Sequence, residues 1–150
     1  PLREPLIAIS RADCIIINGV KNLELEDKLN RNFKQKKLPI FYSKYVIKDI
    51  ENYKNKKILA FAGVGNPSNF FNLLEENNLD VRKTYSFPDH HNYTQKDLIK
   101  IKEDKSMTLV TTEKDYYRMS KEEKKDFEYI EVSLEIENEN NFKDLLKRYL

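Results

Sequence analysis

The two histidines of this 150-residue chain are adjacent and follow a carboxylate, in the segment Asp89-His90-His91. A histidine beside an aspartate can accept or release a proton near neutral pH, and it can also bind a metal. Because neighbouring side chains of an extended segment point in opposite directions, we expect at most one of the two histidines to face a given site. The alternative interpretation is a polar loop that contacts the start of the next helix, which Thr94 is predicted to cap.

Glycine is rare in this chain, and each of the three glycines, Gly19, Gly63 and Gly65, follows a segment with the pattern of a strand. The segment Gly63-Val64-Gly65-Asn66-Pro67 joins an apolar run to a helix that Asn66 is predicted to cap. Backbone N–H groups at such a helix start suit an anion. The loop lacks the Lys-Ser/Thr pair of a P-loop and the third glycine of a dinucleotide-binding loop, and a tight turn without a ligand is the alternative.

A third polar segment, Thr111-Thr112-Glu113-Lys114-Asp115, opens another predicted helix. Thr112 and Asp115 have the spacing of a capping box, although aspartate replaces the usual glutamate or glutamine. Alternatively, the threonine hydroxyls and the Lys114 ammonium lie near a bound phosphate or nucleotide. The residue types allow both interpretations.

Strand-like and helix-like segments alternate along the chain, and they predict the elements that position these residues. This alternation is typical of an α/β fold, with a mostly parallel sheet and helices on both faces. No composition change divides residues 1–150, so we expect a single domain, in which the polar residues 22–37 form an exposed connection. The predicted strands are 14–17, 40–47, 58–64, 81–87, 107–111 and 129–136, and the predicted helices are 67–78, 94–105, one that begins at 112, and 138–149.

The three polar segments each follow a predicted strand, namely 58–64, 81–87 and 107–111. We expect these strands and strand 14–17 to lie parallel in one sheet. The carboxyl ends of parallel strands share one edge, and ligands of open α/β sheets bind there. The sequence therefore predicts one site at which the three polar segments meet.

The composition argues against several classes of protein. The 27 Lys and Arg residues nearly balance the 25 Asp and Glu residues, and a net charge of +2 gives no indication of nucleic-acid binding. The single cysteine, Cys14, excludes an intramolecular disulfide, fits a reducing compartment and is expected to be a buried thiol. No apolar stretch approaches the roughly 18 residues that a membrane-spanning helix needs, and no signal-peptide pattern opens the chain.

Four motifs follow one another along the chain: Pro1-Leu2-Arg3-Glu4-Pro5, Phe61-Ala62-Gly63-Val64-Gly65-Asn66-Pro67 with Phe70-Phe71, Asp89-His90, and Thr112-Glu113-Lys114-Asp115. In this order they resemble the tetraacyldisaccharide 4'-kinase family. The resemblance begins at the first residue and runs to about residue 115, and the predicted final strand and helix fit the family's ending. It places the chain in the C-terminal half of such a kinase, and we expect the half that carries the P-loop to lie upstream. For Arg3 and Glu4 the match gives no mechanism.

The resemblance implies a fold similar to that of P-loop NTPases and a reaction in which ATP, with Mg²⁺, phosphorylates the 4'-hydroxyl of a lipid A disaccharide precursor. It also implies a peripheral place at the cytoplasmic face of the bacterial inner membrane. By this resemblance His90 is the catalytic residue, acting with an acidic base of the upstream half, and Asp89 orients it. The main phosphate and metal contacts belong to that half, so we expect these 150 residues alone to be inactive. Implied nucleotide-side residues are Gly63, Gly65, Asn66, Thr112, Glu113, Lys114 and Asp115, and no metal ligand is assigned.

Two other classes of function are open at this point. Asp89-His90-His91 is also typical of metal-dependent phosphoesterases, which need further metal-ligand clusters such as Asp-x-Asp after a strand, and the sequence has none. The chain could instead be a non-catalytic remnant or docking module of a split kinase. A G-x-x-x-x-G-K-[ST] motif in an upstream reading frame would favour the kinase.

Overall fold

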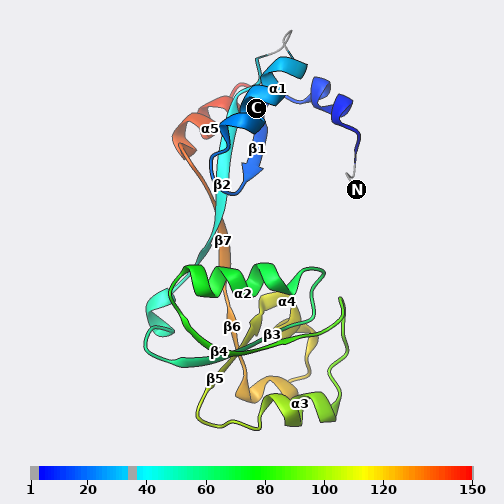
Figure 1. Ribbon diagram of the computed structural model, residues 1–150, viewed down its shortest axis with the longest axis vertical. Coiled ribbons are helices and arrows are strands. Elements are labelled where there is room, and N and C mark those ends of the chain that lie inside the picture. The colour runs from blue at the N-terminus through cyan, green and yellow to red at the C-terminus, as the bar shows by residue number, and fades with distance from the viewer. Residues whose placement is uncertain (1–3, 34–36, 150) are drawn as a thin grey trace. The chain divides into compact units, whose positions relative to one another are not determined.

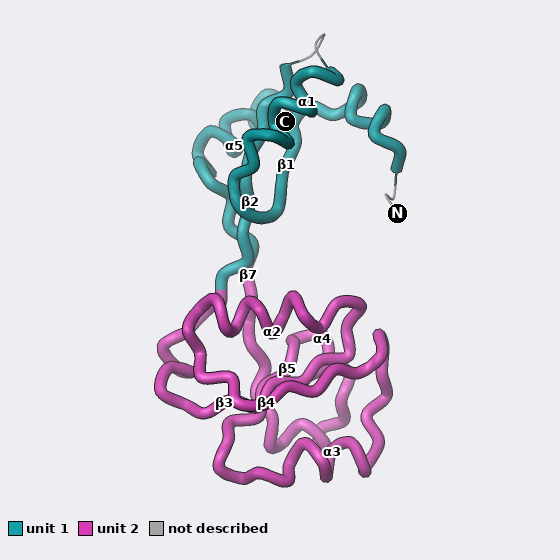
Figure 2. Tube along the Cα trace, viewed as in Figure 1, with its two compact units in different colours: residues 1–46, 134–150 teal, residues 47–133 magenta. Residues whose placement is uncertain are grey.

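The computed structural model describes residues 4–33 and 37–149, and the chain forms two compact units (Figures 1 and 2). One unit is Ile47–Ser133. The other combines the described residues up to Val46 with those from Leu134 onward. The three polar segments singled out from the sequence all lie in the Ile47–Ser133 unit.

The Ile47–Ser133 unit is built on a parallel sheet of four strands in the order β4-β3-β5-β6. β3 is central, and its residues from Ile58 to Ala62 are all buried, which explains its continuous apolar sequence. In the register of the sheet, Ala60 lies beside Thr84 of β4 and Val110 of β5. The strands are β3 (Lys57–Ala62), β4 (Asp80–Ser86), β5 (Thr108–Thr112) and β6 (Glu128–Ile130).

Alternate residues of β3 belong to two cores, and a helix covers each face of the sheet (Figure 1). Ala60 shares a core with α2 (Pro67–Glu76), and Phe61 shares the opposite core with α3 (Gln95–Ile101). The predicted fold class, an α/β fold with a parallel sheet and helices on both faces, is confirmed. Further helical segments of this unit are α4 (Glu113–Arg118) and the 3₁₀ segments η2 (Ile50–Asn52) and η3 (Glu123–Asp126).

The other unit contains a three-stranded sheet in the order β1-β2-β7, with β1 (Ile15–Asn18) parallel to β2 (Ile40–Ile47). The border between the units falls within β2 and β7 (Val132–Ile136). The sequence shows no change of composition at either position, which is why it predicts a single domain. Cys14, just before β1, is a partly buried free thiol. The helical segments are η1 (Leu6–Arg11), α1 (Leu23–Asn32) and α5 (Glu139–Leu146).

Two predictions about strands are wrong. Strand 14–17 does not join the sheet of the other parallel strands, because β1 pairs with β2 in the other unit. Residues 129–136 form two strands in two sheets, β6 and β7, with Glu131 between them. An apolar run identifies a strand but not its partner, and a period-two pattern continues through a short break between two extended segments.

Two predictions about helices also need correction. Residues 23–32 are helical rather than an exposed connection, and Asn22 caps this helix by accepting the Leu25 N–H at 2.9 Å. None of its residues is buried, and the prediction overlooked the i, i+4 spacing of Leu25 and Leu29. Asn66 does stand at the N-cap of α2, but its side chain makes no capping bond and donates instead to Asn69 at 3.2 Å. Residues 34–36 and Arg3 lie outside the described residues.

Candidate active site

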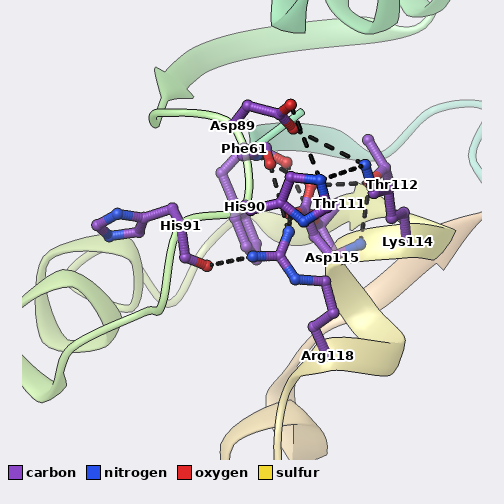
Figure 3. Close-up of polar contacts among 10 residues, drawn as sticks. Phe61, Asp89, His90, His91, Thr111, Thr112, Lys114, Asp115 and Arg118 are labelled. Atoms are coloured by element: carbon purple, nitrogen blue, oxygen red, sulfur yellow. Dashed lines mark hydrogen bonds and ion pairs between the residues drawn. The ribbon is translucent and has the colours of Figure 1, made fainter. Parts of the chain in front are cut away.

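Three loops meet at the carboxyl edge of the parallel sheet (Figure 3). The backbone N–H of His90, in the loop after β4, donates to the carbonyl oxygen of Gly63, in the loop after β3, at 3.0 Å. The N–H of Gly63 donates to Oδ2 of Asp115, on the helix after β5, at 2.9 Å. Two hydrogen bonds thus join all three loops, and the predicted common edge is confirmed for β3, β4 and β5.

His90, Asp89 and Lys114 form an exposed polar cluster on this edge (Figure 3). Lys114 Nζ lies 3.4 Å from His90 Nε2 and 3.8 Å from Asp89 Oδ1, and His90 Nε2 lies 3.9 Å from Asp89 Oδ2. An ammonium group can only donate and so faces a lone pair on Nε2, whereas the carboxylate would receive a proton bound there. The His90 imidazole therefore lies near one possible donor, Lys114, and one possible acceptor, Asp89.

His91 points away from this cluster (Figure 3). Its Nε2 lies 3.0 Å from Asp97 Oδ2, its ring stacks on Phe87 with the centroids 4.8 Å apart, and its side chain is 23% exposed, against 67% for His90. The prediction that only one histidine faces the site is confirmed. The cause is a turn rather than an extended segment, because His90 has a φ of +59°.

The start of α4 combines a cap with a long-range contact. Thr112 accepts the backbone N–H of Asp115 at 3.1 Å and donates its hydroxyl proton to Asp115 Oδ2 at 2.8 Å. In a capping box the carboxylate would also accept the backbone N–H of the N-cap residue Thr112, but here it accepts the N–H of Gly63. Asp115 is 0% exposed, and Thr111 donates to the Phe61 carbonyl oxygen at 2.8 Å, also in the interior. Of this segment, Lys114 is the residue that contacts His90 and Asp89.

The two glycines of the loop after β3 have different neighbours. A Cβ on Gly63 would lie 3.1 Å from Tyr93 Oη and 3.2 Å from Asp115 Oδ1, so a larger residue would press on these neighbours. A Cβ on Gly65 would lie 3.6 Å from Asp89 Oδ2, an ordinary contact that brings this loop next to the cluster. Among the described residues, the backbone N–H groups of Val64 and Gly65 have no hydrogen-bond partner, and they precede α2. They can donate to an anion.

Sequence reasoning missed Arg118 and Tyr93. Arg118 donates to the carbonyl oxygen of His91 at 2.9 Å and lies 3.4 Å from both the Gly63 carbonyl oxygen and Asp115 Oδ1. Its i+3 spacing from Asp115 was the signal available in the sequence. The Tyr93 hydroxyl is buried and has no hydrogen-bond partner in the described part of the chain. Burial, and then the charge of Asp115, raise the pKa of Tyr93.

Glu113 is not part of the cluster formed by His90, Asp89 and Lys114. It is exposed in the first turn of α4 and adds to the raised pKa of Tyr129, about 12, which is caused mainly by the hydrogen bond to Tyr117. The described residues contain no group of three or more His, Cys, Asp or Glu side chains that could hold a metal ion. Within the same residues, no helix has both the length and the apolar character needed to cross a membrane.

Comparison with known proteins identifies similar sequences along the whole chain. The family model described as "Tetraacyldisaccharide-1-P 4'-kinase" (LpxK) matches residues 1–150. The tetraacyldisaccharide 4'-kinase of Francisella tularensis subsp. novicida (strain U112) is 32% identical over 148 residues, which cover 91% of this chain and 44% of the relative. The protein of the same name from Pelodictyon phaeoclathratiforme is 32% identical over 134 residues, covering 79% of this chain and 38% of the relative. The chain thus spans less than half the length of these relatives.

One solved structure has a similar fold. It is described as the crystal structure of the "apo" form of LpxK from Aquifex aeolicus in complex with ATP, and it matches with a TM-score of 0.61. The match covers 98% of this chain and 45% of that protein, at 23% sequence identity. At this identity the likeness concerns the fold alone.

Proposed function

Because the chain belongs to the tetraacyldisaccharide-1-P 4'-kinase family, we propose that it is the C-terminal part of an enzyme that transfers the γ-phosphate of ATP to the 4'-hydroxyl of a lipid A precursor. The acceptor is a tetraacyldisaccharide 1-phosphate, and the enzyme works as a peripheral protein at the cytoplasmic face of the inner membrane. The observation that carries the proposal is the cluster of His90, Asp89 and Lys114 beside a glycine loop at the carboxyl edge of a parallel sheet.

His90 is proposed as the catalytic residue of this part of the enzyme. Its exposed Nε2 lies between a donor and an acceptor, so it can share a proton with an acidic base contributed by the remainder of the kinase. Asp89, whose Oδ2 lies 3.9 Å from His90 Nε2, orients the ring. The Lys114 ammonium stabilises the negative charge on the phosphoryl group as it passes from ATP to the sugar hydroxyl.

The loop after β3 is proposed as the nucleotide side of the site. The unpartnered N–H groups of Val64 and Gly65, the start of α2 at Asn66 and the Lys114 ammonium can all donate to phosphate oxygens of ATP. Thr112 and Asp115 bind the chain's own groups, so their contribution is to the shape of the loops. For Glu113, a place on the nucleotide side of the site is proposed from the family resemblance alone.

The described residues contain no group of three or more His, Cys, Asp or Glu side chains that could hold a metal ion, and we assign no Mg²⁺ ligand to this chain. Positioning and charge stabilisation account for nearly all of phosphoryl-transfer catalysis, and the phosphate cradle that P-loop kinases use is not encoded in these 150 residues. We therefore expect the chain alone not to transfer phosphate. Robust turnover by the isolated chain would contradict this division of roles.

The test is a hybrid kinase in which this chain replaces the matching part of the Francisella enzyme. We expect the hybrid to transfer ³²P from [γ-³²P]ATP to tetraacyldisaccharide 1-phosphate. His90→Ala should lower kcat by about 10²–10⁴-fold with little change in KM for ATP, because it removes a proton-transfer group. His91→Ala is the matched control and should lower kcat less than about tenfold, since His91 points away from the cluster.

Thermal midpoints of both variants separate a catalytic loss from unfolding. Equal losses of kcat for His90→Ala and His91→Ala, or a His90 loss that follows a collapsed midpoint, would overturn the assignment of His90. A folded hybrid that binds ATP but transfers no phosphate would favour the docking-module alternative.

A further inference from the structure

Asp115 is a buried carboxylate whose partners all belong to the chain itself. Its oxygens contact the N–H of Gly63 at 2.9 Å, the hydroxyl of Thr112 at 2.8 Å and Arg118 Nη1 at 3.4 Å, and the residue is 0% exposed. Burying a charge is unfavourable unless it is paired and hydrogen-bonded. A neutral side chain would avoid that penalty, so the retained charge points to a role in geometry.

The contacts of Asp115 lead to His90 through a single residue. The carboxylate holds the N–H of Gly63, and the carbonyl oxygen of the same Gly63 accepts the N–H of His90 at 3.0 Å. Arg118 makes a second connection, because it pairs with Asp115 and donates to the carbonyl oxygen of His91 at 2.9 Å. The backbone is therefore fixed on both sides of His90.

His90 needs such support because of its conformation. Its φ of +59° lies in the left-handed region, which a residue with a Cβ seldom occupies unless the surrounding structure imposes it. This turn sends the His90 ring toward Lys114 while His91 points away (Figure 3). If the turn relaxed, the ring would leave the position in which Lys114 and Asp89 flank it.

We propose that Asp115 is a positioning residue for His90, acting through Gly63 and assisted by Arg118. Asp115 is fully buried, and its carboxylate contacts Gly63, Thr112 and Arg118. Its carboxylate sets the His90 turn and so determines where the imidazole stands relative to Lys114. The consequence for phosphate transfer rests on the function proposed above, whereas the geometric role does not.

The first experiment follows backbone amides of the intact chain by ¹⁵N NMR. The chain has three glycines, so the Gly63 amide can be assigned readily. Asp115→Asn should shift the Gly63 and His90 amide signals and increase their hydrogen exchange by about tenfold or more, since the charge that holds the loop is lost. Asp97→Asn is the matched control, because Asp97 occupies the same position in α3 and binds Thr94 and His91 instead. It should leave the Gly63 and His90 signals in place.

Arg118→Gln provides a second variant if Asp115→Asn does not fold. It keeps Asp115 but removes the charged donor to the His91 carbonyl oxygen, and it should change the His90 amide more than the Gly63 amide. Unchanged Gly63 and His90 amides in folded Asp115→Asn, or unchanged His90 in Arg118→Gln, would overturn the positioning role.

The second experiment measures kcat in the hybrid kinase as a double-mutant cycle. Asp115→Asn should lower kcat about 10-fold or more with KM for ATP within about threefold, and it should have no further effect when His90 is already alanine. A purely structural role would give independent, additive losses in the two backgrounds, which would overturn the proposal. If the wild-type hybrid transfers no phosphate, the proposed function fails, and the amide measurements still decide whether Asp115 positions His90.

Discussion

Two helices of the Ile47–Ser133 unit begin with the same Thr-x-x-Asp pattern, Thr94–Asp97 at α3 and Thr112–Asp115 at α4. In each, the threonine hydroxyl accepts the aspartate N–H, at 3.2 Å in α3 and 3.1 Å in α4. In each, the same hydroxyl donates to the carboxylate, at 2.7 and 2.8 Å. Locally, the two helix starts are alike.

They differ in the backbone N–H that the carboxylate binds. Asp97 accepts the N–H of Thr94 at 2.8 Å and closes a capping box within its own helix, with 25% of its side chain exposed. Asp115 accepts the N–H of Gly63, 52 residues away in sequence, and is fully buried. The first carboxylate binds its own helix and His91. The second links α4, which carries Lys114, to Gly63, whose carbonyl oxygen accepts the N–H of His90. The same pattern is a local cap or a long-range link according to the donor that the fold brings within reach.

Removing each carboxylate should give the largest contrast between the two helix starts. Asp115→Ala should lower the free energy of unfolding by about 3 kcal/mol, because it leaves the Gly63 N–H buried and Arg118 without its ion pair. Asp97→Ala should cost only about 1 kcal/mol, the usual value for a cap that water can replace. Urea unfolding followed by circular dichroism measures both values. Equal losses would mean that the buried link contributes no more than an exposed cap.

A smaller contrast is expected between the two glycines of the loop after β3. Gly63→Ala should destabilise the chain by about 1–3 kcal/mol, since a Cβ would press on Tyr93, Asp115 and the Cβ of His91 at 3.1–3.2 Å. Gly65→Ala should change the free energy of unfolding by less than about 0.5 kcal/mol, because its Cβ would meet Asp89 at 3.6 Å. Thermal or urea unfolding of both variants measures these changes in the free energy of unfolding. A Gly63→Ala variant with an unchanged free energy of unfolding would show that the Gly63–Asp115 hydrogen bond tolerates a shift of the loop.

The sequence predicted features that depend on neighbours along the chain. The apolar run of β3, the Thr94 cap and Pro67 in the first position of α2 are all as expected. The convergence of three loops at one edge also followed from the sequence, because parallel strands place their carboxyl ends together.

Features that depend on distant partners were not predictable in the same way. The sequence left Thr112–Asp115 open between a capping box and a ligand site, and it did not reveal that Asp115 binds the Gly63 N–H of another strand-helix loop. Arg118 showed only an i+3 spacing from Asp115, which many exposed helical pairs share. The apolar run of β1 could not reveal that its partner is β2 rather than β3. These features depend on burial and on contacts between residues that are distant in sequence, and neither can be read from a single sequence.

The last expected effect concerns pH and the α3 start. The backbone N–H of Thr94, then the hydrogen bonds from His91 and the Thr94 hydroxyl, lower the pKa of Asp97 from its ordinary value of 3.8 to about 2. A carboxyl group whose pKa is lowered by folding stabilises the folded state while it is ionised in both states. Its contribution is therefore complete above pH 4 and is lost as the pH falls from about 4 to about 2.

The free energy of unfolding of the wild type and of Asp97→Asn, measured by urea unfolding from pH 6 to pH 2, isolates this contribution. We expect the wild type to be more stable at pH 6 and the difference to shrink between pH 4 and pH 2, since asparagine does not titrate there. Asp104→Asn is a suitable control, because the Ser106 hydroxyl and then its N–H also lower the pKa of Asp104, in a loop away from both helix starts. A difference for Asp97→Asn that stays constant down to pH 2 would mean that the box acts through geometry rather than charge. The starts of α3 and α4 would then differ only in how deeply their aspartates, Asp97 and Asp115, are buried.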